Sequence, residues 1–168
     1  SWNAPVNGPL EERFRRVKAK LQGYVGTPAS TLNAFPAADQ SVYAHYARAY
    51  AYHKAGYPDK ADAESRALMV KDPNDPYFQE IRGQILLEAG EPEAALAPLR
   101  AATEGSRNNP LIATTLGHAL IATEQKQHLP EAIKVLPIAT QRDDQNPFAW
   151  VQLGTAYEQT GDTARAAL

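Results

Sequence analysis

The sequence predicts an all-α fold, an α-solenoid of helix-turn-helix repeats preceded by an N-terminal amphipathic helix. Small residues recur along the chain in two parallel series: Ala49, Gly83, Gly117 and Gly154, and Ala61, Ala95, Ala132 and Ala166. Within each series the spacing is 34 residues, with a single spacing of 37. A period of this length corresponds to one pair of helices, and pairs must stack because one pair alone cannot bury its apolar stripe.

A second observation predicts where the helix pairs begin. The stretches DPNDP, NNP and DDQNP place Asn or Asp ahead of Pro, the residue types preferred at an N-cap and at the first helical position. A first helix, helix A, of about 13 residues follows and ends near Gly56, Gly90 or Gly161. Helix B begins after a short turn, as in GEPEAALAPLRAATE, whose first turn is acidic and contains Pro92.

Residues 1–41 are predicted to form an N-terminal helix and a linker. In PLEERFRRVKAKLQGYV an apolar stripe at helical spacing contains Leu10, Phe14, Val17, Leu21 and Val25. We expect this helix to cap the solenoid with its basic side solvated; the alternative is that the basic side meets anionic lipid or RNA. The following GTPASTLNAFPAADQ is predicted to be a loop with a single helical turn.

Four repeats are predicted after the linker, at residues 42–75, 76–109, 110–146 and 147–168. The third contains a three-residue insertion within ATEQKQHLPEA, and the fourth is truncated in its helix B. We therefore interpret the chain as an excised fragment.

The side chains inside each repeat should follow a common plan. Gly or Ala at the eighth position and Ala at the twentieth are predicted to let helices A and B cross closely. His45 and Arg48 in the first repeat, and Arg82 in the second, stand at positions where large apolar residues are usual in repeats of this kind. We expect another segment of the chain to dock on the first repeat for this reason.

The recurring residues of the four repeats resemble the tetratricopeptide repeat (TPR) signature. Trp150, Leu153, Gly154, Tyr157, Gly161 and Ala166 match it almost position for position, and Leu116, Gly117 and Ala132 repeat part of it. The resemblance covers about residues 42–168. It implies a right-handed TPR superhelix that serves in protein–protein interaction.

The segments YARAYAYHKAG and DPYFQEIRGQILLEAG are similar to segments of a more specific family. They resemble the C-terminal TPR region of bacterial zinc metallopeptidases. This resemblance implies a tail that guides substrates or partners to a protease domain in protein quality control, in the bacterial periplasm or envelope. Zinc would belong only to the catalytic domain, which is missing here. A free-standing TPR scaffold without an attached enzyme is the alternative, and a tail that occludes an active site is a third hypothesis.

Composition and motifs exclude most other classes of function. The net charge is −2, which gives nucleic acid no electrostatic attraction, and no apolar run is long enough for direct membrane insertion. The chain has no Cys and no H-E-x-x-H motif, and His45 and His53 lie about 12 Å apart along a helix. We therefore predict no metal site, no cofactor and no enzymatic activity for this chain.

The partner is predicted to be a protein or peptide bound on the concave face. The TPR resemblance places positions two, five, nine and twelve of each helix A on that face. The predicted partner-binding residues are Tyr43, Tyr46, Tyr50, His53, Tyr77, Glu80, Gln84 and His118, and the same positions include Leu87, Leu111, Thr114, Ile121, Phe148, Val151, Thr155 and Glu158. Tyrosine combines apolar area with a polar tip, which favours binding.

The alternative is that the tyrosines of the first repeat pack against the N-terminal helix. These positions contain no cluster of Lys and Arg, so a clamp for a C-terminal carboxylate is not expected.

Overall fold

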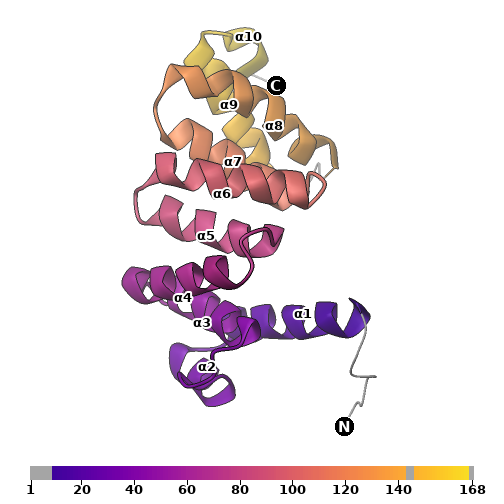
Figure 1. Cartoon of the computed structure of the whole chain (residues 1–168). Helices are drawn as coiled ribbons and strands as arrows, with labels where there is room; N and C mark the ends of the chain where they lie inside the picture. Colours follow the sequence, from indigo (N-terminus) through magenta and orange to yellow (C-terminus); the bar gives the residue numbers. More distant parts are fainter. Residues whose placement is uncertain (1–8, 143–145, 167–168) are drawn as a thin grey trace. The chain divides into compact units, whose positions relative to one another are not determined.

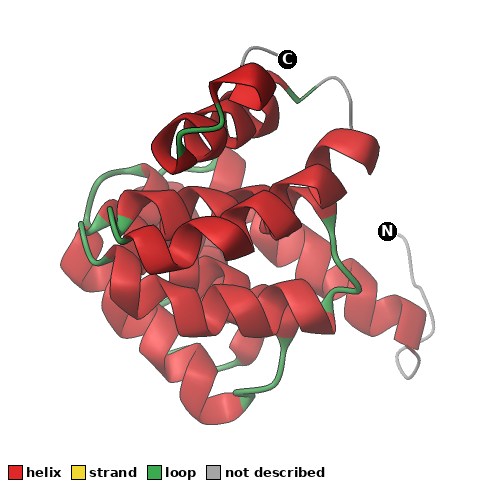
Figure 2. Cartoon of the chain, turned by 90° about the horizontal axis from the view of Figure 1, so that it is seen from above, coloured by secondary structure: helices red, strands yellow, loops and turns green. Residues whose placement is uncertain are grey.

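The computed structural model describes residues 9–142 and 146–166, which contain helices and no strand (Figures 1 and 2). The contacts divide the chain into two compact units, Ser1–Pro73 and Asn74–Leu168. Unit 1 contains α1 (Pro9–Val25), α2 (Pro28–Ala34), α3 (Val42–Lys54) and α4 (Pro58–Lys71). Unit 2 contains α5 (Pro76–Glu88), α6 (Pro92–Gly105), α7 (Pro110–Ala122), the 3₁₀ helix η1 (Lys126–His128), α8 (Leu129–Arg142), α9 (Pro147–Thr160) and α10 (Thr163–Ala166). The predicted all-α fold is confirmed.

The helices A begin at the first residue of each predicted repeat, because a side chain caps each one. Asp75 accepts hydrogen bonds from the backbone N–H groups of Tyr77 and Phe78, at 2.9 and 3.3 Å. Asn109 and Asn146 cap α7 and α9 in the same way. These bonds satisfy N–H groups that the first turn of a helix leaves unpaired.

The turn after each helix A requires a left-handed residue. Gly56, Gly90 and Gly161 occupy it with φ values of 75°, 80° and 82°. In the third repeat Glu124 takes the same position with φ 56°, and the inserted residues after it form η1. An L-residue with a side chain is strained in this conformation.

The core of unit 2 depends on small residues facing large ones. A Cβ on Gly83 would lie 2.4 Å from Leu99 Cγ, and one on Gly117 would lie 2.4 Å from a Leu136 methyl carbon. Leu99 and Leu136 are fully buried at equivalent places in the two helices B. The prediction that small eighth residues allow close crossing is confirmed in these two repeats.

In unit 1 the N-terminal helix α1 buries a different face from the one that was predicted. Helix α1 packs on α3 through Ala19 and Gly23, which are buried, and a Cβ on Gly23 would lie only 2.2 Å from the carbonyl oxygen of Ala47. The predicted apolar stripe points away from α3: Phe14, Val17, Leu21 and Val25 are 43%, 64%, 56% and 65% exposed. The expectation that this stripe caps the repeats is therefore wrong, because the small residues of α1 fit α3 more closely.

The linker is also more ordered than the sequence suggested. It contains the seven-residue helix α2, which begins with a reciprocal capping box between Thr27 and Ser30. A Thr-x-x-Ser pair is weaker as a sequence signal than the usual Ser/Thr with Glu, so a single helical turn was predicted in its place.

The linker docks on the first repeat through Arg48, which is 1% exposed. Its Nη1 atom donates to the carbonyl oxygens of Phe35, Pro36 and Asp39 at 3.3, 2.9 and 3.0 Å, and its Nε atom donates to Glu64 Oε1 at 2.7 Å. His45 Nδ1 lies 2.6 Å from the other oxygen of Glu64. The expected docking of another segment on His45 and Arg48 is thus observed, and the segment is the loop before α3.

Candidate partner-binding cleft

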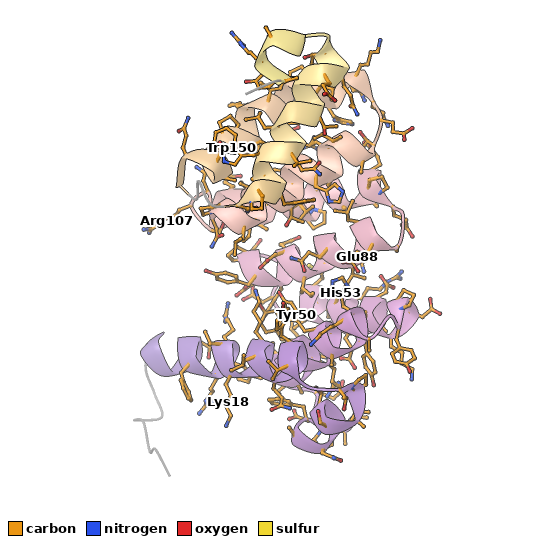
Figure 3. All side chains as sticks on the ribbon, turned by 180° about the vertical axis from the view of Figure 1, so that it is seen from behind. Lys18, Tyr50, His53, Glu88, Arg107 and Trp150 are labelled. Atoms are coloured by element: carbon orange, nitrogen blue, oxygen red, sulfur yellow. The ribbon has the colours of Figure 1, made fainter. Side chains whose placement is uncertain are left out.

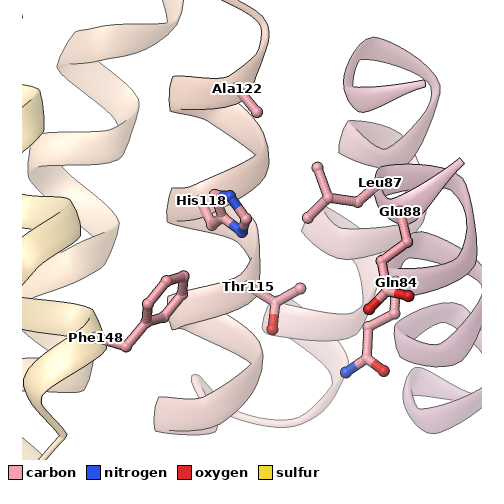
Figure 4. Close-up of a pocket in the computed structure, with 7 residues that line it drawn as sticks. All are labelled: Gln84, Leu87, Glu88, Thr115, His118, Ala122 and Phe148. Carbon is pink, nitrogen blue, oxygen red and sulfur yellow. The ribbon is translucent and has the colours of Figure 1, made fainter. Parts of the chain in front are cut away.

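Unit 2 contains a concave cleft on the side of its helices A. The cleft has a volume of about 450 Å³ and is lined by residues of α5, α7 and α9: Gln84, Leu87, Glu88, Thr115, His118, Ala122 and Phe148 (Figure 4). Of these, Gln84, Leu87, His118 and Phe148 were at predicted positions. Glu88, Thr115 and Ala122 were missed, although each lies four residues after a predicted position, which is the next place on the same helix face.

Two aromatic rings shape one end of the cleft. The rings of His118 and Phe148 meet edge to face, with centroids 5.3 Å apart and planes at 88°. Burial lowers the pKa of His118 below its ordinary value of 6.5. The ring is therefore neutral at pH 7 and presents an uncharged surface.

At the other end, α5 contributes polar groups that are already engaged. The Gln84 side chain donates to Glu80 Oε1 at 3.2 Å, and Glu80 is only 6% exposed. Glu80 was predicted to contact a partner directly; instead it lies beneath Gln84 and holds that amide in place.

Large apolar side chains stand exposed at the second position of each helix A in unit 2. Tyr77, Leu111 and Phe148 are 38%, 61% and 46% exposed, and Val151 on α9 is 61% exposed. Thr114 and Ile121, also predicted for this face, are buried at 5% and 7% exposure. Each residue of this exposed row leaves substantial apolar area in water that packing inside unit 2 does not cover.

The tyrosines of unit 1 do not form a comparable surface. Tyr46 and Tyr50 are 1% and 4% exposed and pack edge to face on each other, with Lys20 of α1 5.0 Å from the Tyr50 ring centroid. Figure 3 shows Tyr50 on one side of α1 and Lys18 on the other. In this conformation Tyr46 and Tyr50 are covered, as the alternative interpretation of packing against the N-terminal helix required.

Tyr43 belongs to the same contact between α1 and α3. Its hydroxyl donates to the carboxylate of Glu12, and Arg15 lies 5.9 Å from its ring centroid. The bond from Tyr43 lowers the pKa of Glu12, whereas burial and the nearby carboxylate raise the pKa of Tyr43. Both effects follow from moving a carboxylate and a phenol into one partly buried pair. His53, the last residue of the predicted set, is half-buried near the end of α3.

Comparison with known proteins agrees with this architecture. No protein-family description matches the sequence, and no curated protein is significantly similar to it. Among solved structures, MamA MSR-1 superimposes with a TM-score of 0.73 at 19% identity, over 94% of this chain and 91% of that one. MamA AMB-1 gives 0.74 at 19% identity over 91% of both chains. YrrB, described as a TPR protein with an unusual peptide-binding site, gives 0.71 at 19% identity over 92% of this chain and 78% of that one.

This chain is a TPR-like all-helical protein. At such identities the similarity concerns the fold and carries no residue of a binding site from one protein to another. The TPR-like helices A nevertheless explain why three separate segments of unit 2 contribute to one cleft, because equivalent positions of successive repeats face the same side.

Within residues 9–142 and 146–166, no group of three or more His, Cys, Asp or Glu side chains is arranged to hold a metal ion. In the same residues no helix is both long and apolar enough to cross a bilayer. The absence of activity and of cofactors stays a prediction from the sequence.

Proposed function

We propose that this chain is a protein-interaction module whose unit 2 binds an extended or helical polypeptide in the cleft between α5, α7 and α9. The observation that carries the proposal is the row of exposed apolar side chains at equivalent positions, Tyr77, Leu111 and Phe148, of which Phe148 also lines the cleft. Covering such side chains releases about 25 cal/mol for each Å² of apolar surface removed from water. A bound polypeptide supplies that cover.

The cleft also indicates the chemistry of the polypeptide. Its lining is apolar or neutral apart from Glu88, and α5, α7 and α9 contain one cation among them, Arg82, which does not line the cleft. We expect a peptide that inserts an apolar side chain beside His118 and Phe148 and carries neutral or basic neighbours. A terminal carboxylate would meet no cation there, so recognition of a chain end is not expected.

We further propose, from the sequence resemblance alone, that the module belongs to a bacterial zinc metallopeptidase of the periplasm or envelope and serves protein quality control. The protease domain itself is then a candidate partner, and zinc would be bound there. A free-standing TPR adaptor fits the structure equally well. The coding sequence upstream of Ser1 distinguishes the two, because the first requires an H-E-x-x-H helix.

An array of short peptides tests the binding proposal. The unmodified chain, Phe148→Asp and Val70→Asp are applied to identical arrays after circular dichroism has shown equal helicity. Val70 is 85% exposed on α4, outside the cleft, and is the matched control. We expect peptides with apolar and basic residues to be retained by the unmodified chain and the control, and lost with Phe148→Asp. Equal retention by all three chains would contradict the proposal.

A further inference from the structure

Helix α1 presents a second apolar surface that the cleft does not explain. Phe14, Val17, Leu21 and Tyr24, here called the α1 seam, are 43%, 64%, 56% and 60% exposed. Their spacing is three, four and three residues, the a and d pattern of a helix that pairs with another helix. Val25, which is 65% exposed, lies beside the end of the seam.

The seam cannot be hidden by rolling α1 over. The opposite side of the helix is fixed on α3, where Gly23 lies against the backbone of Ala47 and Glu12 accepts from Tyr43. At the end of α1, Lys54 of α3 donates to the carbonyl oxygen of Tyr24 and lies 5.1 Å from its ring centroid. Turning the seam inward would break these contacts and leave polar groups unpaired.

The charges around the α1 seam indicate which kind of helix can bind there. Helix α1 contains five basic and two acidic residues, a net charge of 5 − 2 = +3. One of the acids, Glu12, is turned toward Tyr43 and Arg16 and lies away from the seam. Lys18, which is exposed, flanks the seam at a position that faces a paired helix, whereas Lys20 on the other flank lies over the Tyr50 ring of α3. A second copy of α1 would therefore bring like charges together, whereas an acidic helix would bring opposite ones.

We propose that the α1 seam is a docking site for an acidic amphipathic helix of a partner protein. The partner's apolar residues cover Phe14, Val17, Leu21 and Tyr24, and its flanking carboxylates face Lys18. This site lies in unit 1 and is separate from the cleft of unit 2, so a single chain can bind two partners or two parts of one partner.

A pair of designed peptides tests the proposal on the full chain. The probe is a labelled peptide of about four heptads with Leu at the a and d positions and Glu at every e and g position, whose like charges prevent self-pairing. The companion peptide has Lys in place of Glu. Fluorescence anisotropy at low salt should show binding of the acidic peptide and at least about tenfold weaker binding of the basic one.

Variants assign that binding to the seam. Val17→Ser combined with Leu21→Ser should weaken the acidic peptide at least about tenfold, because two apolar side chains lose their burial. Val70→Ser, a change at a still more exposed apolar residue of α4, should leave affinity unchanged. Lys18→Glu should weaken the acidic peptide and strengthen the basic one. These residues are exposed, so the thermal unfolding of the variants should match that of the unmodified chain.

Four results would overturn the proposal. They are equal affinity for the two peptides, acidic-peptide binding that survives the double Ser variant, a seam-dependent dimer in light scattering, and seam-dependent sedimentation with phosphatidylglycerol-containing vesicles but no peptide binding. The last two identify a second copy or an anionic membrane as the occupant. Failure of the peptide array with Phe148→Asp concerns only the cleft and leaves this result unaffected.

Discussion

The side chain of Leu99 occupies the space that a side chain at Gly83 would need, since a Cβ on Gly83 would lie 2.4 Å from Leu99 Cγ. Gly117 and Leu136 repeat the relationship one repeat later. In the first repeat the equivalent residues are Ala49 and Ser65, both fully buried. At these positions the first repeat thus has a larger residue on helix A and a smaller one on helix B than the next two repeats have.

The close fit of Gly83 and Leu99 predicts the effect of changing one of the two residues. Gly83→Ala should lower the free energy of unfolding by about 1–3 kcal/mol, because Leu99 must move to admit the methyl group. Urea unfolding followed by circular dichroism measures the loss. The double variant Gly83→Ala with Leu99→Ser, which copies the first repeat, should lose less than the sum of its single variants. Additive losses would show that the two residues do not share the space.

The left-handed residue in the third turn predicts a stabilising change. Glu124→Gly should raise the free energy of unfolding by about 1 kcal/mol, because glycine adopts a positive φ without the steric cost that Glu124 bears. Gly90→Ala tests the same argument in reverse: nothing lies within 4 Å of the added Cβ, so any loss comes from the backbone. A stable Gly90→Ala variant would count against the explanation.

The buried guanidinium of Arg48 should be costly to remove. Arg48→Met leaves three linker carbonyls and Glu64 without their donor, and we expect a loss of about 3 kcal/mol. Arg66→Met is the matched control, since Arg66 pairs with Asp62 at 2.7 Å while its side chain is 70% exposed. That pair should contribute at most about 1 kcal/mol. Similar losses for the two variants, measured by urea unfolding, would exclude a special role for Arg48.

His118 predicts how stability responds to acid. Burial lowers its pKa in the folded chain, so the unfolded chain binds a proton first as the pH falls below 6.5. The free energy of unfolding should therefore decrease with falling pH, from the unfolded pKa down to the lowered folded pKa, and the contribution of His118 should be constant below that. His118→Gln should remove this component of the pH profile. An unchanged profile between pH 7 and 5 would show that His118 ionises freely in the fold.

The candidate cleft shows how far the TPR resemblance can predict a binding surface. It predicted Gln84, Leu87, His118 and Phe148, because equivalent positions of successive helices A face one side. It also assigned Glu80 to that surface, although Glu80 lies beneath Gln84. Spacing along one helix gives the direction of a side chain, but its exposure depends on the length and position of its neighbours.

The sequence by itself determined the helices A and B of the repeats, the Asn and Asp caps, the repeat period and the small residues at the crossings. Each of these features depends on groups a few residues apart or on a pattern that recurs along the chain. It can therefore be predicted from the sequence. Only the tertiary structure decided which face of α1 would be buried. Its apolar stripe showed that an apolar surface exists, but Ala19 and Gly23 give a closer fit against α3. There Tyr43 donates to Glu12 of α1, and Lys20 of α1 lies over the Tyr50 ring. Close packing between two surfaces depends on the shapes of both, and neither segment specifies it alone.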